Sequence, residues 1–134
     1  MNDLSITRFE RVMIIDDNQI DRYIATRTII KSKFSNTVLE YSSATEALKY
    51  LQDNQSNTEM LPEIIFVDIY MPIMSGFEFM QAYDDLREPL KKYCRIFIIS
   101  STIDSDDITK VENDKNVENF HQKPITADFL RNVS

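Results

Sequence analysis

The chain of 134 residues has few of the residues that many functional sites need: one Gly, one Cys, one His and no Trp. A single Gly excludes the glycine-rich phosphate loops of nucleotide-binding proteins, because those loops require at least two glycines. The single Cys, Cys94, cannot form an intramolecular disulfide, and one Cys with one His cannot by themselves build a zinc site. Chemistry in this chain must therefore come from carboxylates, hydroxyls and amines.

Long apolar runs and a basic surplus are missing as well. Uninterrupted apolar runs are at most four residues long, as at Val12–Ile15, whereas a membrane span needs about 20. The first residues carry no basic and apolar segments of a secretory signal. Lys and Arg number 15 against 22 Asp and Glu, for a net charge of −7. We therefore expect a soluble cytoplasmic protein that binds neither nucleic acid nor membrane.

Short apolar runs alternate with longer amphipathic segments. Strands are predicted at 12–15, 38–41, 64–67, 96–99 and, from a weaker pattern, 117–120. Helices are predicted at about 18–33, at 43–51, at 75–90, and after the N-caps Ser105 and Thr126. Ser43 and Glu46 fit a capping box at the start of the second helix. The alternation predicts five strand–helix pairs.

Two helices carry specific predictions. Ile20, Tyr23 and Ile24 share one face of the first helix, as apolar residues of an amphipathic helix do. Pro89 is expected to end the third helix, because proline breaks helical hydrogen bonding. The strand runs are apolar on both faces, which indicates a parallel sheet covered by helices on both sides. No linker or repeat divides the chain, so we expect one domain over 1–134, with its core from about residue 10.

Polar side chains follow the predicted strands. Asp16 and Asp17 follow the first strand, Asp68 the third and Ser100 the fourth, and Lys123 lies near the end of the fifth. Taken singly, each has a structural explanation as a helix cap, a turn residue, a strand-end polar group or a solvated charge. The carboxyl ends of parallel strands form the functional crevice of such sheets, however, so their joint placement favours a site.

The residue types at this edge suit phosphoryl chemistry. Clustered carboxylates repel one another unless a cation intervenes, and an all-oxygen cluster suits Mg²⁺. A Lys and a Ser can donate hydrogen bonds to phosphoryl oxygens. A carboxylate can also act as the nucleophile and become an acyl phosphate.

From about residue 11 onward the chain resembles the receiver domains of two-component response regulators. The resemblance rests on four segments in order: Ile14–Asp17, Val67–Gly76, Ile98–Ser101 and Lys123–Pro124. It implies an α/β fold of the flavodoxin-like (βα)₅ type, a doubly wound parallel sheet with strand order 2-1-3-4-5.

The resemblance also assigns roles. Asp68 would be the phosphoacceptor, receiving a phosphoryl group from a histidine kinase or a histidine phosphotransfer protein. Asp16, Asp17 and Asp68 would hold Mg²⁺ together with the backbone carbonyl of Tyr70. Lys123 would pair with a phosphoryl oxygen.

Further positions match the switch and the structural residues of that family. Ser100 and Phe120 would form the switch, and Tyr70 and Thr102 would tune the rate of phosphoryl loss. In addition, Pro124 would follow a cis peptide bond. The single glycine, Gly76, indicates unusual backbone angles or a close backbone approach. His121 follows a strand residue, so we expect a structural role rather than phosphorylation.

The resemblance implies a stand-alone receiver with no conventional enzymatic activity, limited to self-phosphorylation from a phosphodonor and autodephosphorylation. Its output would be phosphorylation-dependent binding to an unknown downstream protein, or phosphorelay, by a monomer or a weak dimer. Two alternatives stay open. A Mg²⁺-dependent phosphatase with an aspartyl nucleophile would carry a second Asp where Tyr70 stands. A receiver-like module that is never phosphorylated would not need the intact acidic set.

Overall fold

We describe a computed structural model of the chain, which covers residues 6–102 and 104–133. Five parallel strands form one sheet in the order β2-β1-β3-β4-β5, as the sequence predicts. The strands are β1 (Arg11–Ile15), β2 (Thr37–Tyr41), β3 (Ile64–Asp68), β4 (Arg95–Ser100) and β5 (Val117–Gln122).

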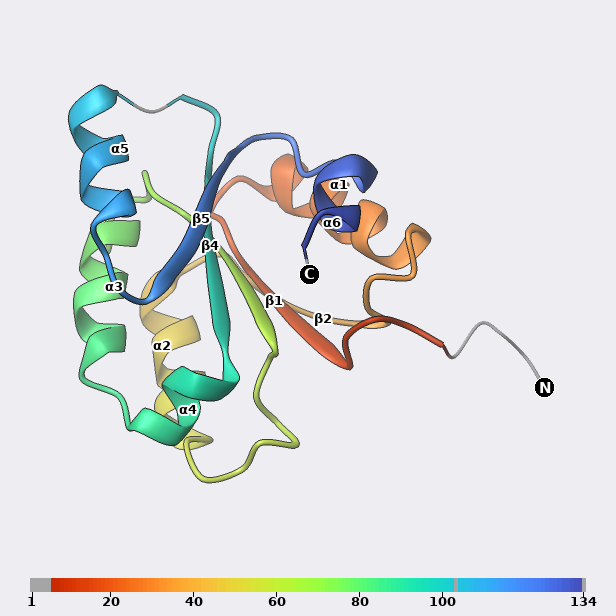
Figure 1. Cartoon of the computed structure of the whole chain (residues 1–134), viewed down its shortest axis with the longest axis horizontal. Helices are drawn as coiled ribbons and strands as arrows, with labels where there is room; N and C mark the ends of the chain where they lie inside the picture. Colours follow the sequence, from red (N-terminus) through yellow and green to blue (C-terminus); the bar gives the residue numbers. More distant parts are fainter. Residues whose placement is uncertain (1–5, 103, 134) are drawn as a thin grey trace.

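Helices cover both faces of this sheet. They are α1 (Gln19–Lys31), α2 (Ala44–Asp53), α3 (Gly76–Asp84), α4 (Glu88–Tyr93), α5 (Ser105–Glu112) and α6 (Ala127–Arg131). Figure 1 shows α1 and α6 on one side of the strands and α2, α3 and α5 on the other. Within residues 6–102 and 104–133, none of the helices has the length and apolar character needed to cross a bilayer.

The central strands supply two hydrophobic cores. In β1, Met13 and Ile15 belong to the cluster that packs with α2 and α3, whereas Val12 and Ile14 belong to the cluster that packs with α1 and α6. Successive residues of a strand point to opposite faces, so an unbroken apolar strand needs cover on both sides. This explains why β1, β3 and β4 lie in the middle of the sheet.

Two helix boundaries differ from the sequence prediction. The helix expected over 75–90 is two helices, and Pro89 lies in the first turn of α4 instead of ending α3. Proline is tolerated there because the first-turn N–H groups have no intrahelical acceptor. Ser105 is the first residue of α5 rather than its N-cap; the cap is Asp104, whose side chain accepts from a backbone N–H of the first turn.

The capping box predicted at Ser43 is formed only in part. The Ser43 side chain accepts from the Glu46 N–H at 3.4 Å, without the reciprocal bond from Glu46 among the described hydrogen bonds. A complete capping box stands at Ser75 and Glu78 at the start of α3. It fixes the first turn of the helix that follows the β3 loop.

The apolar face predicted for the first helix is exposed. The exposed fractions of Ile20, Tyr23 and Ile24 are 70%, 60% and 44%, while Ala25 and Ile29 are buried against the sheet. Apolar residues surround much of the α1 axis, so the sequence pattern does not single out the buried face. An unpacked apolar face therefore lies on the outside of α1.

Candidate functional site

The strand ends meet in one cleft at the carboxyl edge of the sheet. Asp68 and Ser100 are the last residues of β3 and β4, and Lys123 directly follows β5. The cleft has a volume of about 570 Å³, and its lining includes Asp17, Asp68, Tyr70, Ser100, Thr102 and Lys123. The structure thus brings together most of the residues that the sequence singles out.

Three carboxylates form an acidic cluster, by which we mean Asp16, Asp17 and Asp68. Each contributes an oxygen, and these oxygens lie within 4.8 Å of one another. Asp16 and Asp68 are buried, while Asp17 is exposed. An all-oxygen set that is open to solvent on one side fits a hard cation such as Mg²⁺, which keeps several waters.

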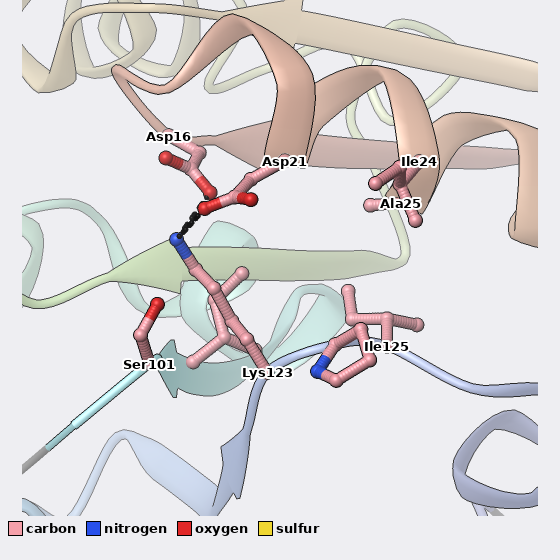
Figure 2. A pocket seen from close by; sticks show the side chains of 9 residues that line it. Asp16, Asp21, Ile24, Ala25, Ser101, Lys123 and Ile125 are labelled. Carbon is pink, nitrogen blue, oxygen red and sulfur yellow. Dashed lines mark hydrogen bonds and ion pairs between the residues drawn. The ribbon is translucent and has the colours of Figure 1, made fainter.

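Lys123 bridges the acidic cluster to α1. Its Nζ lies 2.7 Å from Asp16 Oδ2, 2.9 Å from Asp21 Oδ2 and 3.3 Å from Asp68 Oδ2. Burial lowers the Lys123 pKa, but its hydrogen bonds to Asp16 and Asp21 outweigh this and raise the pKa overall. Figure 2 shows the amine pointing at Asp16 and Asp21. Because its pKa is raised, Lys123 stays charged.

Asp68 is more basic than an ordinary carboxylate. Burial raises its pKa to about 6; Lys123 opposes this rise and Asp16 adds to it. The backbone N–H of Tyr70 donates to Asp68 Oδ1 at 3.3 Å, which favours the charged form. At neutral pH Asp68 is mostly ionised, so an oxygen lone pair is available.

A known family matches most of this chain. The family model described as the response regulator receiver domain matches residues 12–133. The chain belongs to this family. A rice relative, two-component response regulator ORR1 of Oryza sativa subsp. japonica, is 28% identical over 129 residues, which cover 92% of this chain and 54% of that protein. The chain spans about half the length of the curated relative ORR1.

Solved receivers share the fold. A two-component response regulator from Cytophaga hutchinsonii is 27% identical, with 93% of each chain covered and a TM-score of 0.85. The receiver domain of the histidine kinase CKI1 from Arabidopsis thaliana, solved in complex with Mg²⁺, is 25% identical over 88% of this chain and 86% of that one, with a TM-score of 0.69. The predicted flavodoxin-like class is confirmed.

In this receiver, Tyr70, which lines the cleft, is hydrogen-bonded to the first turn of α5. Its hydroxyl donates to Asp107 Oδ2 in α5 at 2.5 Å. This hydrogen bond is the main reason why the pKa of Tyr70 rises to about 12. The sequence alone does not single out Asp107, because first-turn acids are explained by the helix dipole.

The two predicted switch residues occupy different places. Ser100 is buried, and its hydroxyl donates to the Thr102 carbonyl at 2.6 Å, so it faces the following loop. Phe120 is not among the residues that line the cleft. It pairs with Ile98 of β4, and its half-buried side chain packs against the hydrophobic core on the α2 and α3 side of the sheet. Whether the two move together stays a prediction.

Gly76 is required by a close approach of two backbones. A Cβ on Gly76 would lie 2.7 Å from both Asp68 O and Ile69 Cα. Of the two explanations that the sequence left open, unusual backbone angles or a close approach, the structure supports the second: Gly76 has no positive φ. The Gly76 N–H also donates to Ile69 O at 2.7 Å, which fastens the start of α3 to the end of β3.

A strained backbone position lies three residues before Gly76, at Ile73. Its φ is 69°, and its side chain is 96% exposed. The Met74 N–H donates to Pro72 O at 2.7 Å across it. A three-residue turn with positive φ at a β-branched residue is rare, and such strain concentrates at functional loops.

Pro124 and His121, on either side of Lys123, have defined local geometry. The Lys123–Pro124 peptide bond is cis. His121 stacks on Phe129 with ring centroids 3.8 Å apart, and its Nε2 lies 3.0 Å from Pro124 O. His121 lies within β5 and is held by packing rather than presented on a helix.

Asp21 is a residue at the floor of the cleft that the sequence alone does not reveal. It lies in the first turn of α1, after the N-cap Asn18, whose side chain accepts from the Asp21 N–H at 2.9 Å. A first-turn acid is again expected from the helix dipole. Its contact with Lys123 joins residues 102 positions apart. A local sequence pattern cannot predict a contact over that separation.

Proposed function

We propose that this receiver accepts a phosphoryl group on Asp68 from a histidine of a histidine kinase or a phosphotransfer protein. The observation that carries the proposal is the position of Asp68, in the acidic cluster and 3.3 Å from Lys123 Nζ. An Asp68 oxygen forms the new O–P bond while the N–P bond of the donor histidine breaks. The histidine nitrogen keeps the electron pair, and an acyl phosphate remains on Asp68.

The acidic cluster, with the backbone carbonyl of Tyr70, would hold Mg²⁺. The bound ion would supply positive charge to the phosphoryl oxygens, which is the main requirement of phosphoryl transfer. Lys123 adds a second charge, because its ammonium already points at Asp68. Asp16 is held in place by its own Lys123 contact and by the Asn18 N–H, which donates to Asp16 Oδ1 at 2.9 Å.

The exposed face of α1 is where the histidine-bearing protein would dock. Ile20 is 70% exposed and also lies at the rim of the cleft, so a partner that covers this face would reach Asp68. Burying exposed apolar side chains favours association.

Phosphorylation would be transmitted through Ser100 and Phe120. The Ser100 hydroxyl would leave the Thr102 carbonyl and donate to a phosphoryl oxygen. Phe120, on the neighbouring strand, would then move into the vacated space and change the surface of α5 and β5. A downstream protein would recognise that surface, or the phosphoryl group would pass to a second histidine.

Tyr70 and Thr102 would set the lifetime of the acyl phosphate. The Tyr70 ring stands at the cleft and is fastened by Asp107, so it would restrict the approach of water to Asp68. Autodephosphorylation would therefore be slow.

The test is the intact mass of the protein after incubation with acetyl phosphate and Mg²⁺. We expect one added phosphoryl group. It should not form when a chelator replaces Mg²⁺, and it should not form in Asp68→Asn. Asp106→Asn is a control, because it removes an exposed acid in the first turn of α5, outside the acidic cluster. No adduct with any donor would overturn the proposal in favour of a module that is never phosphorylated. Rapid hydrolysis of a free phosphate ester would favour the phosphatase alternative.

A further inference from the structure

The Lys123 ammonium is fully engaged by carboxylates. Its Nζ contacts Asp16 at 2.7 Å, Asp21 at 2.9 Å and Asp68 at 3.3 Å, and an ammonium has three N–H donors. The Lys123 side chain is 11% exposed, so water offers few further partners. A phosphoryl oxygen can bind Lys123 only if one of these carboxylates gives way.

Asp21 differs from the other two partners. Among the described residues, the carboxylates that gather around one candidate metal position are Asp16, Asp17 and Asp68, without Asp21. A cation in the cluster would offset the charges of Asp16 and Asp68 and weaken their hold on Lys123. Asp21 would keep its full charge. It also lies closer to the Lys123 Nζ than Asp68 does.

Asp21 also approaches Lys123 from a different element. It belongs to α1, whereas Asp16 follows β1 and Asp68 ends β3. Figure 2 shows Asp21 reaching from the helix to the amine, beside a separate cavity of about 230 Å³ that Ile24 and Ile125 also line. Asp21 lines the cleft in front of Asp68 too, so an incoming phosphoryl group would meet its negative charge.

We propose that Asp21 is a positioning residue that holds the Lys123 ammonium on the α1 side of the cleft and competes with the phosphoryl group for it. This inference rests on the proposed function of Asp68. If Asp21 competes in this way, the site binds a phosphoryl group more weakly than the same site would without the Asp21 charge. A metal ion is affected in the opposite way. The negative charge of Asp21 near the acidic cluster attracts the cation and strengthens its binding.

The opposite signs give the test. Asp21→Asn keeps the shape of the side chain and removes its charge. At saturating Mg²⁺ we expect this variant to bind beryllofluoride, a phosphoryl analogue, about fivefold tighter, and to bind Mg²⁺ alone about threefold more weakly. Calorimetric titration measures both constants. A variant that merely loosens the fold would weaken both.

A metal-free measurement reports on Lys123 itself. The ¹⁵N–¹H signal of the Lys123 ammonium should shift in Asp21→Asn and stay unchanged in Asp106→Asn, which removes an acid from the first turn of α5. The inference is overturned if Asp21→Asn leaves this signal in place, or if it changes both binding constants in one direction or neither. A wild-type protein that binds neither Mg²⁺ nor beryllofluoride would overturn the proposed function, and this inference with it.

Discussion

Asp68 carries its charge at a cost in stability. Its pKa is about 6 in the folded protein and about 3.9 in an unfolded chain. The folded protein therefore binds more protons than the unfolded chain between these values, and its stability falls as the pH rises through this range. Burial of the carboxylate is the main cause.

Asp68→Asn should remove this loss. In chelator, we expect the variant to match the wild type near pH 4 and to be more stable by about 2 kcal/mol above pH 7. Urea unfolding at a series of pH values measures the difference. A difference in unfolding free energy that does not vary between pH 4 and pH 7 would contradict this explanation.

Gly76→Ala should strain the joint between β3 and α3. The added Cβ would meet backbone atoms of Asp68 and Ile69 at 2.7 Å, and overpacking of this kind costs about 1–3 kcal/mol. Denaturant unfolding tests this, with Gln81→Ala, on the exposed face of α3, as a control that should change little. Equal stabilities of Gly76→Ala and the wild type would show that the contact relaxes freely.

At the residue scale, the sequence predicts the site residues that stand at strand ends. Asp16, Asp68 and Lys123 lie together because each stands at the carboxyl end of a strand in a parallel sheet. Asp21 and Asp107 could not be found in this way. Each lies in the first turn of a helix, and each acts through a partner on another element.

At the scale of the elements, the strands are the most predictable part. β3 is buried along its whole length, and its first four residues, Ile64–Val67, are all apolar. This short apolar segment predicts both a strand and a central place in the sheet. Helix faces and ends were harder to predict. Pro89 suits the first turn of a helix as well as the residue after one, and α1 has apolar residues on both its buried and its exposed sides.

The exposed face of α1 predicts a selective defect. Changing Tyr23 and Ile24 together to Ser should slow phosphoryl transfer from a phosphorylated histidine protein about tenfold, because apolar contact area is lost. Phosphorylation by acetyl phosphate, which needs no docking surface, should change less than about twofold. Stopped-flow or gel-based transfer assays compare the two donors.

A matched control for this defect lies on the same helix. Ile30 is 46% exposed near the end of α1 that is far from the cleft. Ile30→Ser should leave both donors unaffected. Equal losses with the protein donor in Ile30→Ser and in the Tyr23 and Ile24 variant would place the docking surface elsewhere.

At the scale of the whole molecule, a metal ion held by residues at the ends of two strands, β1 and β3, should stabilise the fold. Binding at about one hundred times the dissociation constant adds about 2.7 kcal/mol to the free energy of unfolding. We expect Mg²⁺ to raise the melting temperature by about 5–10 °C. Differential scanning fluorimetry with and without chelator measures the shift.

Asp17→Asn should abolish most of this Mg²⁺ effect and leave the metal-free melting temperature nearly unchanged, because Asp17 is exposed. Asp53→Asn, an exposed acid paired with Lys49 on α2, should keep the full effect. If Mg²⁺ stabilises Asp17→Asn as much as the wild type, the acidic cluster is not the metal site.

The central claim is that the phosphoryl group goes to Asp68. The most direct measurement treats the protein with acetyl phosphate and Mg²⁺, reduces the acyl phosphate with borohydride, and maps the product by tandem mass spectrometry. Reduction converts a phosphorylated aspartate to homoserine, so we predict homoserine at position 68 in the wild type and no homoserine in Asp68→Asn. Homoserine at Asp16 or Asp17, or at no position, would contradict the claim.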